Sequence, residues 1–153
     1  MPASLKHEIK QKKPFASLEE EAMLSIRRTS AVLEHRFAEA LKPYGITGTQ
    51  YNVLRILRGA GTEGLCRNEV RDRLVAQVPD VTRLLDRLEE SGHIQRERST
   101  SDRRLVSTLI TAKGLQLLKA LDGPVDAINK EQLGHLSAKQ LSTLTELLAL
   151  ARS

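Results

Sequence analysis

The chain has 153 residues, of which 40% are hydrophobic and 28% are charged, and its 24 Lys and Arg against 19 Asp and Glu give a formal charge of +5. No apolar run approaches the roughly 18 residues of a membrane span, and residues 1–13 lack the apolar core of a signal peptide. We therefore expect a cytoplasmic protein of one domain with no membrane segment, whose basic charge favours polyanionic partners.

The first predicted element is a helix that follows a basic arm. Residues 1–14 contain four lysines and little apolar content, so we expect a flexible arm that ends at Pro14. Apolar residues then recur at spacings of three and four, which predicts an amphipathic helix over residues 17–42. Ser17 and Glu20 have the spacing of a capping box at its start.

Two shorter helices come next. Thr47 and Gln50 form a second capping-box pattern, which predicts a helix from there to about Gly59. A glycine-rich loop over 59–64 separates it from a short helical pattern that contains Val70 and Leu74.

The segment 77–90, QVPDVTRLLDRLEE, predicts a short amphipathic helix. Apolar residues stand at positions 81, 84, 85 and 88 on one face, and the other faces are charged or polar. Pro79 suits the first turn of a helix, and Ser91-Gly92 supplies a stop.

The pattern changes after Gly92. Residues 94–98 and 105–110 read as strands around a polar turn at 99–103, which predicts a β-hairpin with a charged tip. Thr111 begins a helix interrupted or bent near Gly123-Pro124, and Ser137 with Gln140 begins a final helix. A hairpin directly after a short basic helix predicts a winged helix-turn-helix, a mainly α fold with a small β-hairpin wing.

These segments carry a family likeness. The stretch RLLDRLEESGHIQRERSTSDRRLVSTLITAKG closely resembles the recognition helix, wing and following helix of MarR-type regulators, and GITGTQYNVLRILRGAG resembles their second helix. The resemblance covers residues 15–153 as a single domain. It implies a winged lobe at about 45–112 and a homodimer in which the N- and C-terminal helices, about 17–42 and 112–152, interlock. The apolar stripes at 18–41 and 115–151 independently favour a second subunit, because they are longer than one small lobe needs.

The predicted helix at 77–90 has the features of a DNA recognition helix, with one face for the protein and another for base edges and phosphates. We expect Thr82 and Arg83, on its first turns, to contact bases or phosphates, and Arg87, one turn later, to reach a phosphate. Asp80 has two open roles: it accepts from a cytosine amino group, or it caps the N–H groups at the helix start.

The predicted wing carries the other candidate contacts. Asp102 and Arg104 stand two positions apart, which in an extended turn puts both side chains on one side, where an ion pair can aim the guanidinium. The resemblance implies that Arg104 enters the minor groove while Asp102 holds it. Arg96, Arg98 and Arg103 are expected phosphate ligands, which add affinity but little sequence information.

We therefore expect a sequence-specific transcriptional regulator, a repressor, that binds a near-palindromic operator in double-stranded DNA. The resemblance also implies a pocket between the dimer helices and the winged lobe, where an amphipathic or phenolic effector would change the spacing of the lobes. The nearby aromatic and imidazole side chains would line it, although such residues are more often core: Phe37, Tyr44, Tyr51 and His35.

Two other hypotheses stay open. One is a winged-helix module that binds proteins and not DNA. The other is a redox sensor at Cys66, the only cysteine, which stands beside Arg67 near a helix start where a thiolate is favoured; more often such a residue is a small buried hydrophobe. The histidines lack partners at metal-ligand spacing, and no nucleophile motif or phosphate loop occurs, so we predict no metal, cofactor or catalytic residue.

Overall fold

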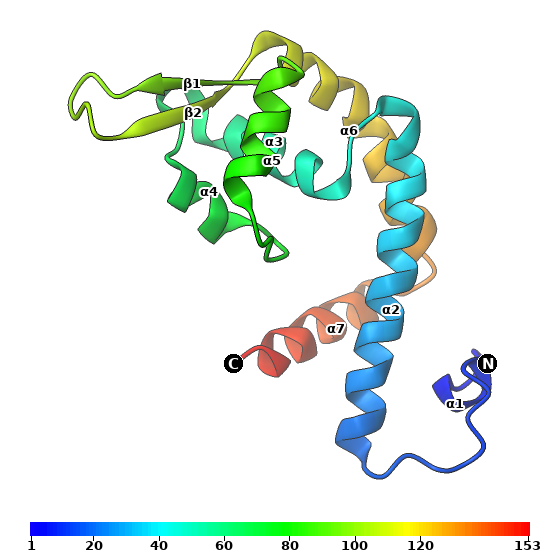
Figure 1. Ribbon diagram of the computed structural model, residues 1–153. Coiled ribbons are helices and arrows are strands. Elements are labelled where there is room, and N and C mark those ends of the chain that lie inside the picture. Colours follow the sequence, from blue (N-terminus) through cyan, green and yellow to red (C-terminus); the bar gives the residue numbers. More distant parts are fainter.

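The computed structural model describes residues 1–153 as a mainly helical chain with one β-hairpin (Figure 1). The predicted fold class is confirmed. In chain order the elements are α1 (Leu5–Glu8), α2 (Leu18–Leu41), the 3₁₀ turn η1 (Lys42–Tyr44), α3 (Gly48–Ala60), the 3₁₀ turn η2 (Gly61–Glu63), α4 (Arg67–Arg73), α5 (Val81–Glu90), β1 (Ile94–Arg98), β2 (Val106–Ile110), α6 (Ala112–Leu133) and α7 (Ala138–Ala151).

The helix starts follow local side-chain chemistry. Thr47 with Gln50 and Ser137 with Gln140 form complete capping boxes at α3 and α7, as predicted. At α2 the predicted box is only half formed. Ser17 Oγ accepts the backbone N–H of Glu20 at 3.1 Å, but the Glu20 carboxylate accepts from the N–H of Ala16 and not from that of Ser17.

The winged lobe, which we define as α3, α4, α5, β1 and β2, encloses most of the core. Helices α3, α4 and α5 and strand β1 each contribute buried apolar side chains, and Leu41 of α2 and three residues of α6, Leu118, Leu121 and Val125, complete the core. The buried apolar set is Leu41, Ile46, Tyr51, Val53, Leu54, Leu57, Leu65, Val70, Val81, Leu85, Leu88, Ile94, Leu118, Leu121 and Val125. This continuous core fixes α5 and the hairpin relative to one another.

The hairpin is antiparallel and is tied to the lobe at its base. Its register pairs Ile94 with Ile110 and Arg98 with Val106. Thr108 also exchanges two backbone hydrogen bonds with Leu65, at 2.7 and 3.0 Å. The residue before this bridge, Gly64, has to be a glycine. Its φ is +68°, and a Cβ there would lie 2.5 Å from the carbonyl oxygen of Thr108.

Helix α6 runs from Ala112 to Leu133 through Gly123 and Pro124, so of the two expectations there, an interruption or a bend, the interruption is wrong. Proline has no N–H, and the carbonyl four residues earlier, that of Ala120, therefore loses its usual helical donor. Ala120, Gly123 and Pro124 are all exposed, so water can reach that carbonyl group.

The outer half of the molecule is much less buried than the lobe. Figure 1 shows α1, α7 and the first half of α2 extending away from the lobe, at the end opposite the hairpin. No residue of α7 is buried, and large apolar side chains stay exposed, among them Leu18 at 81%, Leu147 at 58% and Leu150 at 69%. None of the helices combines the length and the apolar character that crossing a bilayer demands.

The N-terminal arm contains a feature that its composition did not indicate. Ser4 caps the single helical turn α1, and Glu8 pairs with Arg28 of α2 at 3.6 Å. The arm therefore makes one polar contact with the long helix.

Candidate nucleic-acid interface

Helix α5 is anchored on one face and polar on the other. Val81, Leu85 and Leu88 are buried in the core, whereas Thr82, Arg83 and Arg87 are exposed. This is the division of faces that the sequence predicted for the helix, and it leaves the three candidate contact residues open to solvent.

The start of α5 lies later than predicted. Asp80 is the N-cap residue, and its Oδ1 accepts the backbone N–H of Arg83 at 2.9 Å. Pro79 therefore precedes the cap and does not occupy the first helical turn. Of the two roles open to Asp80, the structure contains the cap. The carboxylate accepts a backbone N–H that has no partner within the helix, and its negative charge interacts favourably with the positive end of the helix dipole.

The tip of the wing is held by Asp102, but not in the way expected. Asp102 Oδ1 accepts the backbone N–H of Arg104 at 3.0 Å, and its carbonyl oxygen accepts the N–H of Leu105 at 3.0 Å. The two side chains form no ion pair, because the carboxylate is engaged by the backbone in a local turn. The Arg104 guanidinium is consequently unpaired and exposed.

Arg96 has a different role from the phosphate contact expected of it. Its guanidinium donates to Asp86 and, at 3.0 Å, to Glu89, both on α5, while its backbone N–H donates to the same Glu89 carboxylate at 3.0 Å. Its side chain is only 25% exposed. The bond from Arg96 holds the pKa of Glu89 below its usual value, and the Glu89 and Asp86 carboxylates raise the pKa of Arg96. Arg96 therefore fastens the wing to α5.

The remaining candidate arginines have no acidic partner. None of the ion pairs in the chain includes Arg83, Arg87, Arg98, Arg103 or Arg104, and all five are exposed. Only a 3.4 Å bond from Arg98 to the carbonyl oxygen of Arg103 engages one of their side chains. Their positive charge is thus available to an external anion.

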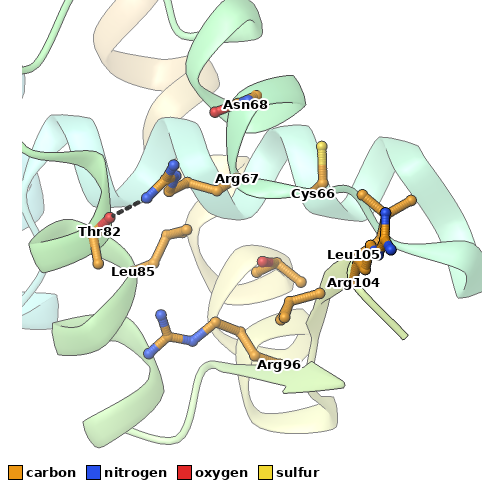
Figure 2. A pocket seen from close by; sticks show the side chains of 10 residues that line it. Cys66, Arg67, Asn68, Thr82, Leu85, Arg96, Arg104 and Leu105 are labelled. Carbon is orange, nitrogen blue, oxygen red and sulfur yellow. Dashed lines mark hydrogen bonds between the residues drawn. The ribbon is translucent and has the colours of Figure 1, made fainter. Parts of the chain in front are cut away.

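An open hollow of about 360 Å³ joins α4, α5 and the wing (Figure 2). Its walls contain Cys66, Arg67, Asn68, Thr82, Leu85, Arg96, Arg104, Leu105, Val106 and Thr108. Arg67 reaches from α4 to α5, where its Nη1 donates to Thr82 Oγ1 at 3.1 Å; Arg104 lies on the other side of the hollow (Figure 2). The hollow brings Thr82 and Arg104, predicted separately, into one surface.

Arg67 and Asn68 also belong to this surface, although the sequence pattern does not single them out. They stand at the first positions of α4, and the only sequence signal was a cation beside Cys66 at the start of a short helix. Cys66 itself is the N-cap residue, and its backbone N–H donates to the Glu69 carboxylate at 2.9 Å, which lowers the pKa of Glu69.

A second hollow of about 440 Å³ lies between α2, α3 and the loop that precedes α5. Phe37 and Tyr51 line it, and their rings pack edge to face with centroids 5.5 Å apart. Arg55 and Glu34 supply charges of both signs. Tyr44 and His35, which were expected to line the same pocket, do not line this hollow and are exposed.

Known proteins resemble this chain over α5 and most of the wing, and the likeness extends over most of its length. The family model described as the MarR family matches residues 44–105, which include α5 and most of the wing. A MarR transcription factor of known structure from Planctomyces limnophilus is 39% identical, and the alignment covers 90% of this chain and 99% of that one, with a TM-score of 0.68. The chain belongs to the MarR family.

Two further relatives agree with the MarR assignment. The HTH-type transcriptional regulator PrsX of Escherichia coli is 28% identical over 129 residues, which are 84% of this chain and 78% of PrsX. A mutant MarR from E. coli, solved in complex with operator DNA, is 25% identical, with coverage of 97% of this chain and 99% of that one and a TM-score of 0.77. As a MarR-family member the chain is a transcriptional regulator.

Proposed function

We propose that this MarR-family regulator binds duplex DNA as a homodimer, through α5 and the wing, and acts by occupying an operator. The observation that carries the proposal is the group of exposed arginines without acidic partners on α5 and the wing tip. A basic surface of this kind neutralises phosphates and supplies sequence-independent affinity. We further propose that the protein acts in the cytoplasm, as a repressor, and without catalysis.

Within this proposal α5 enters the major groove. Its buried apolar face leaves Thr82 and Arg83 on the first turn, the part of a recognition helix that lies deepest in the groove. Arg87, one turn later, is suited to a phosphate on the flank. Asp80, already engaged as the N-cap, orders the turn that presents Arg83, and any contact with a cytosine amino group would add to that bond.

The wing reaches the neighbouring minor groove in the same proposal. Arg104 is the inserted residue, because its guanidinium is free and its backbone is held by Asp102. A narrow, A/T-rich minor groove attracts an arginine by its negative potential. Arg98 and Arg103 contact phosphates, whereas Arg96 sets the distance between the wing and α5 through Asp86 and Glu89.

Dimerisation is supported by apolar surface that the single chain leaves uncovered. Leu147 and Leu150 of α7 are more than half exposed, as are Leu18 and Met23 of α2. At about 25 cal/mol for each Å² of apolar surface, leaving such a stripe in water is unfavourable, and a second copy would cover it. A two-fold symmetric dimer presents two winged lobes, which match half-sites about one helical turn apart in a near-palindromic operator.

The hollow between α2, α3 and the loop before α5 is a second candidate site, for a small effector. Phe37 and Tyr51 offer an apolar wall, and Arg55 offers a partner for a phenolate or carboxylate. Val75 and Ala76, in the loop before α5, also line it, and the N–H of Val75 donates to the Asn52 side chain at 2.9 Å. An effector would release DNA only if it bound the non-binding geometry more tightly.

Selection of bound fragments from genomic DNA tests the proposed function. The purified full chain is incubated with sheared duplex, and bound fragments are recovered and sequenced. The proposal predicts one enriched near-palindromic motif whose half-sites lie about 10 base pairs apart. Absence of any enriched motif, together with DNA association that does not depend on salt, would favour the protein-interaction module.

A further inference from the structure

Arg67 of α4 and Thr82 of α5 are joined by a 3.1 Å hydrogen bond across the helix-turn-helix (Figure 2). We infer that Arg67 is a positioning residue that turns the Thr82 hydroxyl into a hydrogen-bond donor toward DNA, and so biases the base read at that position. The inference rests on the proposed function, because it assumes that α5 lies in the major groove.

The direction of this bond follows from the two side chains. A guanidinium has only donors, so Thr82 Oγ1 is the acceptor. A threonine hydroxyl has one proton and two lone pairs, and Arg67 occupies one lone pair. No bond within the chain uses the hydroxyl proton of Thr82, and the residue is exposed. The proton is therefore left for an acceptor outside the protein.

The positive charge of Arg67 strengthens this preference. Hydrogen bonds in a chain polarise one another, and a charged donor on the oxygen makes the O–H a better donor and a poorer acceptor. Arg67 has no carboxylate partner that would neutralise it, unlike Arg71 on the same helix, which pairs with Asp72 at 3.1 Å. The polarisation of the hydroxyl is thus undiminished by a local anion.

Major-groove chemistry converts a donor into a base preference. Purine N7, guanine O6 and thymine O4 are acceptors, whereas the amino groups of cytosine and adenine are donors. A lone threonine hydroxyl serves either kind of group. With Arg67 in place, Thr82 should favour the acceptor edges and disfavour the cytosine amino group, so Arg67 would affect sequence reading without itself touching a base.

The test is a double-mutant cycle read out as base preference. The affinity of the selected operator and of all single base-pair variants in one half-site is measured by fluorescence anisotropy. The proteins are wild type, Arg67→Ala, Thr82→Val and the double variant. Thr82→Val keeps the shape of the side chain and removes the hydroxyl. Arg71→Ala is the control: it removes one positive formal charge from α4, here one that is paired with Asp72, and it breaks no bond to α5.

The inference predicts that Arg67→Ala lowers discrimination by about three- to tenfold at one position in each half-site, the value of one hydrogen bond. In the Thr82→Val background Arg67→Ala should leave discrimination unchanged, and Arg71→Ala should not change it in either background. Thermal unfolding checks that each variant is folded.

Three outcomes would overturn the inference. Arg67→Ala could weaken every duplex by the same factor in both backgrounds, which would make Arg67 a phosphate contact only. Arg67→Ala could also leave both the affinity and the base preference of the protein unchanged. A wild-type protein with no base preference at any position would overturn the proposed function and this inference together, so the two failures are distinguishable.

Discussion

Asp102 Oδ1 accepts the backbone N–H of Arg104 at 3.0 Å, and the side chains of these two residues form no ion pair. The carboxylate is therefore used to shape the turn, and the guanidinium remains free to bind outside the protein. The bond orders the wing tip before DNA arrives, which lowers the entropy lost on binding.

The first prediction concerns that bond. Asp102→Ala removes the acceptor, and we expect operator affinity to fall by about three- to tenfold because the wing tip must then be ordered during binding. Asp102→Asn keeps an oxygen acceptor at the same place and should recover most of the affinity. Anisotropy titrations measure both variants; an Asn variant as weak as the Ala variant would show that the negative charge, and not the turn, is what matters.

The second prediction concerns the free guanidinium of Arg104. Arg104→Ala should weaken binding by about tenfold at operators with A/T-rich flanks and much less at G/C-rich flanks, because only a narrow minor groove attracts the arginine strongly. Arg103→Ala is the neighbouring control and should weaken both kinds of duplex equally. Equal losses for Arg104→Ala on all flanks would argue against minor-groove reading.

The third prediction uses the linkage between Arg96 and Glu89. The pKa of Glu89 in the folded protein lies below the value of 4.5 that applies to the unfolded chain. Its contribution to stability is therefore complete above pH 4.5 and is lost as the pH falls through the lower, folded-state value. Urea unfolding between pH 7 and 3 should show a less steep loss of stability below pH 4.5 in Glu89→Gln than in wild type. Parallel curves would contradict the linkage.

The same cluster yields a fourth prediction about stability near neutral pH. Arg96→Met should lower the melting temperature by about 2–4 °C, equivalent to about 1 kcal/mol, because Asp86 and Glu89 lose their shared cation. DNA affinity should also fall, since the wing is then less firmly held on α5. Arg98→Met, on the same strand but without a carboxylate partner, should leave the melting temperature unchanged.

The fifth prediction tests the uncovered stripe on α7. Leu147→Glu places a charge in the proposed subunit interface and should convert the dimer to monomers, with a loss of operator affinity of at least about tenfold because two linked half-sites no longer bind together. Ala149→Glu adds the same charge two positions along the helix, hence on its other side, and should leave the dimer intact. Light scattering after size-exclusion chromatography distinguishes the two.

Much of the fold could be predicted because its signals are local. The capping pair of Thr47 and Gln50 acts within one helical turn. The two strands are predicted by their β-branched residues and by the helix stop at Gly92 that precedes them. Two local signals competed at the start of α5, because Pro79 and Asp80 both suit a helix start. The hydrogen bond that the backbone N–H of Arg83 donates to the Asp80 carboxylate fixes the start at Asp80.

The site was less predictable because its contacts join distant positions. Arg96 lies 10 positions from Asp86 and meets it through the packing of the hairpin on α5, and Arg67 lies 15 positions from Thr82. A sequence pattern specifies which residues are cationic but not which cations a carboxylate neutralises. For this reason the sequence predicts a phosphate ligand at Arg96, which the structure pairs with Asp86 and Glu89, and gives no sign of the bond from Arg67 to Thr82.

The salt dependence of operator affinity tests the central claim most directly. Affinities of wild type and of Arg87→Ala, the variant that lacks the proposed phosphate contact of α5, are measured across a series of salt concentrations. If α5 and the wing neutralise phosphates, log affinity should fall linearly with log salt, and loss of one phosphate contact per subunit should reduce the slope by about 2 in the dimer, or about 1 for each contact. An affinity that does not change with salt would contradict the assignment of this arginine surface to DNA.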